Sequence, residues 1–304
     1  MKIALVGLGK IALDQHVPAL ATSSDWELAA TVSRSATVDG VEAWHDLDAM
    51  LAARSDIRVV SLCLPPVPRF DYAIRSLRAG RYVMLEKPPG AALSECAVLE
   101  RTAQQLRLGI FATWHSREAA MVAPARAWLA DKTVTGGRIT WREDVRQWHP
   151  GQAWVFESGG MGVFDPGINA LSILTGILPR PVHLRGARLE VPENCQTPIA
   201  ARLELSDNIE ADFDWLQEGP PTWSMTLETD GGTLELHDGG ARMVIDGVDG
   251  QAADAAPNGE YPRLYERMAR LVQAGRSEMD MAPMVLVADA FTLGRRVSVA
   301  PFHF

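Results

Sequence analysis

Residues 2–12 read KIALVGLGKIA, and this stretch decides the fold of the chain. An apolar run at 2–6 leads directly into Gly7-Leu8-Gly9-Lys10-Ile11-Ala12, which matches the pattern G-x-G-x-x-A. The first glycine permits a tight turn, the second lets the backbone approach a pyrophosphate, and the small last residue lets a helix pack on the strand. A phosphate would then lie at the positive N-terminus of that helix. The motif therefore predicts a dinucleotide site at the first strand–helix turn.

The first 113 residues alternate short apolar runs with amphipathic stretches. Continuously apolar strands separated by helices are typical of a parallel sheet that is covered on both faces. We therefore predict a Rossmann-type, doubly wound domain over residues 1–117. The expected strands are 2–6, 28–32, 59–64, 82–85 and 108–112, and the expected helices are 10–20, 47–54, 71–79 and 94–107.

After residue 118 the pattern changes to alternating strands, with one helix near 121–130 and another from about 165. The expected strands lie at 137–148, 182–191, 199–205, 209–215, 224–229, 233–237 and 242–245. Helices at 261–274 and 283–297 close the chain, and 249–259 reads as an exposed loop. This predicts an α+β domain over 118–304, built on a large, mostly antiparallel open sheet, with a C-terminal helix packing back on the first domain. The open face of that sheet favours a homodimer.

Composition excludes several classes of protein. A chain of 304 residues is long for a single core, and its net charge of −9 argues against nucleic acid or an anionic membrane as a partner. No stretch reaches the roughly 18 apolar residues of a membrane span, and the N-terminus reads as a strand rather than a signal peptide. Three scattered cysteines without a CxxC motif are typical of a reducing cytoplasm, and no Cys/His spacing predicts a metal.

The end of the second expected strand indicates which dinucleotide is bound. Ser33 and Arg34 follow that strand, and no carboxylate occurs before Asp39. Arginine and hydroxyl donors suit a 2′-phosphate, whereas a carboxylate would suit a 2′-hydroxyl, so NADP is favoured and NAD is the alternative. Leu64 and Pro65 end the third strand and face the adenine–ribose side, unless the prolines serve only as a helix entry. The expected cofactor-binding residues are Gly7, Gly9, Lys10, Ile11, Ser33, Arg34, Leu64, Pro65, Glu86 and Lys87.

Two further sequence motifs carry a resemblance to a known family. Glu86-Lys87-Pro88 ends the fourth strand, and Gly159-Gly160 precedes Asp165-x-x-x-Asn169. With the glycine motif, these resemble the glucose–fructose oxidoreductase/inositol 2-dehydrogenase (Gfo/Idh/MocA) family over essentially the whole chain. MLEKPPGA (84–91), FATWHSR (111–117), EDVRQWHPGQ (143–152) and GVFDPGINALSI (162–173) are similar to the family branch of bacterial L-arabinose and D-galactose 1-dehydrogenases.

The resemblance implies oxidation of the C1 hydroxyl of a sugar to an aldonolactone, with hydride transfer to a nicotinamide. It implies that Lys87 hydrogen-bonds substrate and cofactor ribose, next to Glu86, with a Lys87–Pro88 bond that is often cis in relatives. Asp165 and Asn169, four residues apart, share one helical face. Many members carry His at the second position, but Asn169 cannot take up a proton, so the base role passes to Asp165. An N-cap role for Asp165 is compatible with this.

Aromatic residues and His115 complete the expected substrate site. His115 follows the fifth strand, at the carboxyl edge where ligands bind to parallel sheets. Trp148 and Trp223, with Trp154, are expected to stack on a sugar ring, although core roles stay open. Glu143 and Asp144 read as solvated strand residues, and His16 as structural or near the diphosphate. Two alternatives also stay open: another sugar or cyclitol dehydrogenase of the family, and a non-catalytic NAD(P)- or sugar-sensing regulator.

Overall fold

The computed structural model describes residues 1–250 and 259–304, so most of the expected loop at 249–259 lies outside the described residues. The chain forms two compact units. The first comprises Met1–His115 and Glu260–Asp280, and the second comprises Ser116–Gly259 and Met281–Phe304. A single boundary near residue 117 does not describe this division, because 260–280 belongs with the N-terminal unit.

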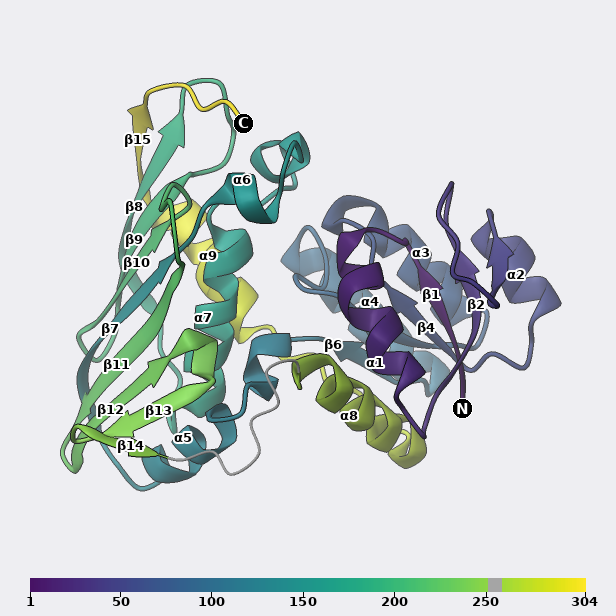
Figure 1. Cartoon of the computed structure of the whole chain (residues 1–304), viewed down its shortest axis with the longest axis horizontal. Helices are drawn as coiled ribbons and strands as arrows, with labels where there is room; N and C mark the ends of the chain where they lie inside the picture. The colour runs from purple at the N-terminus through teal and green to yellow at the C-terminus, as the bar shows by residue number, and fades with distance from the viewer. Residues whose placement is uncertain (251–258) are drawn as a thin grey trace. The chain divides into compact units, whose positions relative to one another are not determined.

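The first unit is built on a six-stranded sheet in which every neighbouring pair is parallel, which confirms the Rossmann-type prediction (Figure 1). The short outer strand β3 had not been expected. In spatial order the strands are β3 (Glu42–Trp44), β2 (Glu27–Val32), β1 (Lys2–Val6), β4 (Val59–Leu62), β5 (Tyr82–Leu85) and β6 (Ile110–Ala112).

Helices bury both faces of this sheet, because alternate strand residues point to opposite sides. Ala4 and Val6 of β1 share an apolar cluster with residues of α2 (Leu47–Ala53), α3 (Pro66–Arg78) and α4 (Leu93–Leu106). Ile3 and Leu5 share the opposite cluster with residues of the π-helical turn η1 (Ala12–His16), α1 (Val17–Ala21) and α8 (Glu260–Ala274). One layer of the N-terminal unit therefore comes from late in the chain.

The second unit is built on a nine-stranded sheet that is mostly antiparallel, as predicted; only the β7–β10 and β8–β15 pairs are parallel. Helices α5 (Val122–Leu129), α7 (Phe164–Ile177) and α9 (Ala282–Leu293) lie on one face of this sheet, and no described helix covers the other (Figure 1). In spatial order the strands are β14 (Val248–Gly250), β13 (Arg242–Ile245), β12 (Gly232–His237), β11 (Thr222–Thr229), β7 (Val134–Arg142), β10 (Ile209–Asp214), β9 (Ala200–Leu205), β8 (Leu184–Pro192) and β15 (Arg295–Val299).

Two expected elements of this unit end earlier than predicted. The strand expected at 137–148 stops at Arg142, because the Asp144 side chain accepts a hydrogen bond from the Arg146 N–H (2.9 Å) and caps α6 (Val145–Trp148). The helix expected at 283–297 stops at Leu293. Gly294 leaves the helical conformation, and Arg295–Val299 pairs in parallel with β8.

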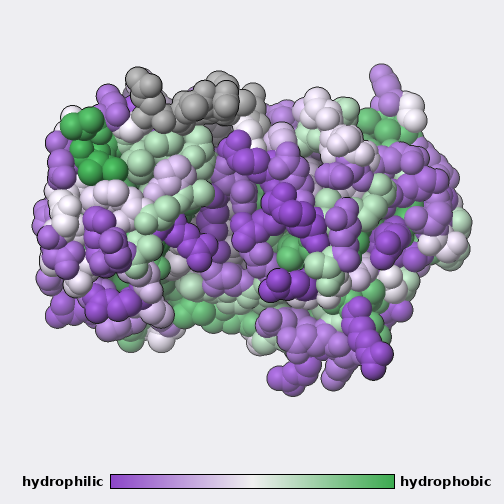
Figure 2. Space-filling view, turned by 90° about the horizontal axis from the view of Figure 1, so that it is seen from below, coloured by the Kyte–Doolittle hydropathy of each residue, from purple (hydrophilic) through white to green (hydrophobic). Residues whose placement is uncertain are grey.

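Within residues 1–250 and 259–304, no helix has the length and apolar character needed to cross a membrane. Hydrophilic residues are spread widely over the face of the molecule seen in Figure 2. The same described ranges hold no group of three or more His, Cys, Asp and Glu side chains arranged to bind a metal ion.

Candidate active site

The glycine loop between β1 and the following helix has the geometry of a phosphate-binding turn. Gly7 has φ +86°, donates its N–H to the Val32 carbonyl (2.9 Å), and would bring a Cβ within 2.8 Å of the Leu64 side chain. A Cβ on Gly9, by contrast, would meet no heavy atom within 4 Å. The helix begins at Lys10, immediately after this open position. The loop therefore fits a dinucleotide pyrophosphate, which would lie against the Gly9 backbone.

The remaining expected cofactor residues lie around the same edge of the sheet. Lys10 and Ile11 are exposed on the first helical turn, where Lys10 pairs with Asp14. Ser33 is half-buried directly after β2, with its hydroxyl accepting from the Ala36 N–H (3.3 Å), and Arg34 next to it is exposed. Leu64 packs against the glycine loop, as noted above.

Pro65 and Pro66 have the helix-entry role that the sequence had left open. Pro65 is the N-cap of α3, and the helix begins at Pro66.

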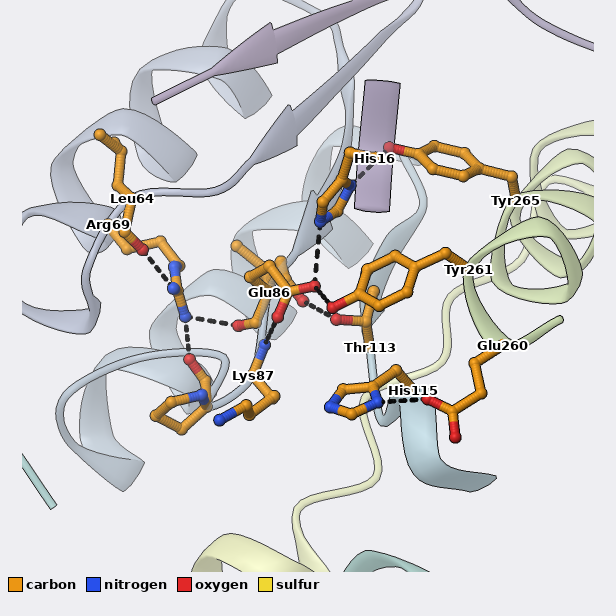
Figure 3. Close-up of polar contacts among 12 residues, drawn as sticks. His16, Leu64, Arg69, Glu86, Lys87, Thr113, His115, Glu260, Tyr261 and Tyr265 are labelled. Atoms are coloured by element: carbon orange, nitrogen blue, oxygen red, sulfur yellow. Dashed lines mark hydrogen bonds and ion pairs between the residues drawn. The ribbon is translucent and has the colours of Figure 1, made fainter. Parts of the chain in front are cut away.

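Glu86, at the end of β5, is the centre of a buried network (Figure 3). Its Oε1 lies 3.0 Å from His16 Nε2 and accepts a hydrogen bond from the Tyr261 hydroxyl (2.9 Å). Its Oε2 accepts from the Lys87 N–H (2.8 Å), and His16 Nδ1 lies 2.7 Å from the Tyr265 hydroxyl. The network thereby joins β5 to the first helix and to α8.

The charges in this network follow from its contacts. Burial raises the pKa of the Glu86 carboxyl, but the hydrogen bond and charge of His16, with the charges of His115 and Arg69, outweigh burial and lower it to about 2. Burial lowers the pKa of His16, but Cys63, Tyr265 and Glu86 around it outweigh burial and raise the pKa well above its ordinary value. Glu86 is therefore a carboxylate and His16 an imidazolium at neutral pH.

A buried arginine holds the turn that carries Lys87. The guanidinium of Arg69, only 3% exposed, donates to the carbonyl oxygens of Leu64, Glu86 and Pro88. The Lys87–Pro88 peptide bond is cis. The half-buried Lys87 thus has its backbone fixed by Glu86 and Arg69, while its ammonium group points away from the Glu86 carboxylate (Figure 3).

His115 is held by two residues at the start of α8. Its Nδ1 lies 2.6 Å from Glu260 Oε2, and its ring stacks on Tyr261 with centroids 5.6 Å apart. Nearby, the Thr113 hydroxyl donates to the Leu85 carbonyl (2.9 Å). Nothing in the sequence pointed to Glu260 or Tyr261, because they follow His115 by more than 140 residues and match no motif.

In the second unit, Asp165 lies in the first turn of α7 and is 7% exposed. The N-cap of this helix is Val163, so Asp165 is not the cap. A Cβ on Gly162 would lie 2.2 Å from the Pro198 carbonyl oxygen, so the loop before the helix is closely packed. Asn169 lies one turn further along and is half-buried, and His149 Nε2 lies 3.1 Å from Asp165 Oδ2.

One of the expected aromatic residues, Trp223, contacts a carboxylate that the sequence had misassigned. Glu143 is buried, not solvated, and accepts hydrogen bonds from the indole N–H groups of Trp215 (3.2 Å) and Trp223 (2.9 Å). The burial of this carboxylate is tolerated because each of its two oxygens accepts a hydrogen bond. Trp148, which ends α6 rather than a strand and is 37% exposed, lies 5.7 Å from Trp223 between ring centroids. Trp148 and Trp223 therefore form one partly exposed aromatic surface.

A glycine-rich dinucleotide loop after β1, together with a lysine fixed at the end of β5, defines a Rossmann-type NAD(P)-binding oxidoreductase. Residues 1–112 match a family model described as an oxidoreductase family with an NAD-binding Rossmann fold. The chain is also 40% identical over 319 residues to the galactose 1-dehydrogenase of Pseudomonas fluorescens, an alignment covering 100% of this chain and 99% of that protein. It therefore belongs to the Gfo/Idh/MocA oxidoreductase family.

Solved structures agree with this assignment. The crystal structure of D-galactose-1-dehydrogenase from Rhizobium etli matches with a TM-score of 0.94 and 48% identity, covering 99% of this chain and 97% of that one. KijD10, a 3-ketoreductase from Actinomadura kijaniata crystallised with NADP and TDP-benzene, matches with a TM-score of 0.82. Its identity is 17%, with coverage of 98% and 99%, so it supports the fold alone.

Proposed function

We propose that the protein is an aldose 1-dehydrogenase that oxidises the C1 hydroxyl of D-galactose, and of L-arabinose, to the aldonolactone, with NADP preferred over NAD. The observation that carries the proposal is the buried carboxylate of Asp165, one helical turn before Asn169, in a chain resembling two galactose 1-dehydrogenases along its whole length. A regulator that only binds its ligands would have no use for a proton acceptor of this kind.

The proposed chemistry assigns one role to each residue. The nicotinamide accepts the hydride from C1 when the cofactor is bound. Asp165 accepts the proton that leaves O1, and the Lys87 ammonium stabilises the negative charge that develops on this oxygen. Asn169 can donate to and accept from a neighbouring sugar hydroxyl. The fixed backbone of Lys87 limits the directions its side chain can take, which favours a preorganised site.

The proposed cofactor contacts follow the carboxyl edge of the first sheet. The Gly7–Gly9 turn would hold the pyrophosphate, and Ser33 and Arg34 would bind the 2′-phosphate of NADP. The exposed guanidinium of Arg34 suits a phosphate dianion, and no carboxylate directly follows β2 to pair with a 2′-hydroxyl.

The proposed substrate contacts are His115, Trp148, Asn169 and Trp223, in addition to Lys87 and Asp165. Trp148 and Trp223 offer the flat apolar surface on which a pyranose stacks. L-Arabinose and D-galactose share their ring configuration and differ by the C5 hydroxymethyl group, so one site could accept both. Another sugar or cyclitol of the same family is the second candidate.

The proposed assembly is a homodimer through the second sheet, in the cytoplasm. The helix-free face of that sheet presents cross-strand pairs such as Arg138 with Glu210 and Arg142 with Asp212. A self-complementary pattern of charges suits a two-fold interface. The cysteines Cys63, Cys96 and Cys195 are all free thiols, which suits a reducing compartment.

The decisive experiment follows NADPH absorbance over a panel of aldoses and cyclitols with wild-type protein, Asp165→Ala and Asp131→Ala. We expect galactose and arabinose to be oxidised, Asp165→Ala to lose turnover while NADP still binds, and Asp131→Ala, which changes an exposed carboxylate, to match the wild type. If NADP binds but no sugar is oxidised, the proposal fails. If Asp165→Ala loses only NADP affinity, its assigned role is wrong.

A further inference from the structure

His149 is an ionisable group that the mechanism above does not use. It is the C-cap of α6, and its Nε2 lies 3.1 Å from the Asp165 carboxylate on α7. Its ring meets Trp215 (5.3 Å) and Trp154 (6.3 Å) edge-on, which fixes its plane. Among the described residues in these contacts, only Asp165 carries a charge. About one fifth of the His149 side chain remains exposed, so protons can exchange with solvent.

The hydrogen bonds on the far side of the ring fix where its protons lie. Gln152 Oε1 lies 3.2 Å from Trp154 Nε1 and 3.3 Å from His149 Nδ1. An indole N–H can only donate, so the Gln152 atom that faces it is the carbonyl oxygen. That oxygen can only accept, so His149 Nδ1 carries a proton. The lone pair of a neutral ring would then be on Nε2, 3.1 Å from a carboxylate oxygen that is also an acceptor.

Two acceptors at this distance repel each other, so the Nε2–Oδ2 contact must hold a proton. We infer that His149 and Asp165 form a proton-sharing pair in which an imidazolium keeps Asp165 ionised, with Gln152 and Trp154 as the residues that set the direction of the hydrogen bonds. His149 acts through Asp165 and is therefore a positioning residue. The inference deepens the proposed function, because it rests on Asp165 as the proton acceptor.

The pair offers a route for the proton that Asn169 cannot provide, because an amide does not take up a proton. During oxidation the C1–H bond breaks with its electron pair, which leaves as hydride to the oxidised nicotinamide. The O1–H bond breaks, its proton passes to Asp165, and the C1–O bond becomes a carbonyl. Once Asp165 is neutral, the proton on His149 Nε2 no longer faces a charged oxygen. The pair can then release one proton to solvent through the exposed part of His149 and return to its starting state.

The first test needs no substrate. We would label the seven histidines with ¹⁵N, assign the His149 signals from their loss in His149→Asn, and record both ring nitrogens at pH 7. Protonation of both nitrogens is expected in the wild type. In Asp165→Asn we expect a neutral ring with its proton on Nδ1. A neutral wild-type ring with its proton on Nε2 would overturn the inference, because Gln152 would then donate to Nδ1.

The second test uses the dependence of kcat/KM on pH. Removing the neighbouring positive charge in His149→Asn should move the acid limb up by about one to three pH units, and lower kcat by about 10²-fold at neutral pH. Gln152→Glu, which adds a negative charge beside Nδ1, should stabilise the imidazolium and show no upward shift of the acid limb. His183→Asn, which changes an exposed histidine, should match the wild type.

The two tests separate the possible failures. A loss of kcat in His149→Asn with an unmoved acid limb would show a merely structural role and overturn the inference. A wild type that oxidises no sugar, yet shows a doubly protonated His149, would instead overturn the proposed function and leave the pair intact. Binding of NADP to each variant serves as the control for folding.

Discussion

At the scale of single residues, Glu86 shows how the first unit tolerates a buried charge. Removing a carboxylate from water is costly unless ionic and hydrogen-bonding partners compensate it. Here His16 supplies the charge, and Tyr261 and the Lys87 N–H supply further donors. The polar end of this strand therefore fixes the backbone of Lys87, the residue proposed to face the substrate.

This network predicts a pH-dependent stability. The pKa of Glu86 is lowered from 4.5 to about 2, so its contribution is present above pH 4.5 and is lost as pH falls toward 2. The difference corresponds to about 3 kcal/mol. We expect Glu86→Gln to lower the unfolding midpoint at pH 7, and the gap from wild type to close between pH 4.5 and 2. Thermal unfolding across this range measures the gap, with Glu27→Gln at an exposed site as the control. A gap independent of pH would contradict the ionic account.

His16 predicts the opposite trend at higher pH. Its pKa is raised well above the ordinary value of 6.5, so its stabilising charge is fully present below pH 6.5 and is lost as pH rises through the higher folded value. We expect His16→Gln to be less stable than the wild type at pH 6, with the difference shrinking only in alkaline solution. A difference that already vanishes between pH 6 and 7 would show that the buried ring is neutral.

Arg34 carries the prediction about cofactor choice. If its guanidinium binds the 2′-phosphate, Arg34→Ala should weaken NADP binding by about 1.5–3 kcal/mol, the usual range for a hydrogen bond to a charged group, and leave NAD unchanged. Titration calorimetry with both dinucleotides measures this. Arg78→Ala, at another exposed arginine of the same unit, is the matched control. Equal losses for both cofactors would remove Arg34 from the phosphate site.

At the scale of elements, the two glycines of the glycine loop differ in conformation and in surroundings. Gly7 has a left-handed conformation and no room for a side chain, whereas Gly9 lies outside the positive-φ region and has open space beside it. The structure itself therefore requires glycine at position 7, whereas a requirement for glycine at position 9 rests on the proposed pyrophosphate contact.

Substitutions of Gly7 and Gly9 give a matched prediction. Gly7→Ala should destabilise the protein by about 1–3 kcal/mol, because the added Cβ is strained and meets Leu64. Gly9→Ala should unfold like the wild type but bind dinucleotide much more weakly, because its Cβ would occupy the space proposed for the pyrophosphate. Thermal unfolding and calorimetry of both variants measure the two effects. Normal binding by Gly9→Ala would place the pyrophosphate elsewhere.

Elements that the sequence misassigned share one physical cause. The hydrophobic periodicity of the sequence located β7 and α9, but the ends of these elements depend on local interactions that compete with it. The Asp144 side chain caps α6 and so ends the strand, and Gly294 leaves the helix so that the chain can enter β15. Glu143 was predicted to be solvated because a charged residue at the end of an expected strand usually faces water. Only the fold shows that two indole N–H groups from Trp215 and Trp223 meet it.

At the scale of the whole molecule, the chain returns to its first sheet after building most of the second unit. Helix α8 supplies Tyr261, Leu264 and Tyr265 to the apolar layer over Ile3 and Leu5. Without it, the part of this sheet face that η1 and α1 leave uncovered would be exposed to water.

Residues 1–115 alone should therefore not fold cooperatively, whereas 1–115 joined to 260–280 by a flexible linker should fold and bind NADP. Circular dichroism on heating and dinucleotide calorimetry compare the two forms. A cooperative transition of 1–115 alone, at the same midpoint as the linked form, would show that α8 is dispensable. A linked form carrying Leu264→Asp, which puts a charge in the apolar layer, is the matched control and should behave like 1–115.

The sequence alone determined the two kinds of sheet, the dinucleotide loop and the family, because strand periodicity and the G-x-G-x-x-A and Glu-Lys-Pro motifs are local properties. The tertiary structure alone decided which groups surround Glu86, His115, Glu143 and Asp165. Most of their partners come from elements far apart in the chain, such as α8 for Glu86 and β11 for Glu143. A buried charge is stabilised by whatever the fold brings within hydrogen-bonding distance, and spacing along the sequence carries no record of that.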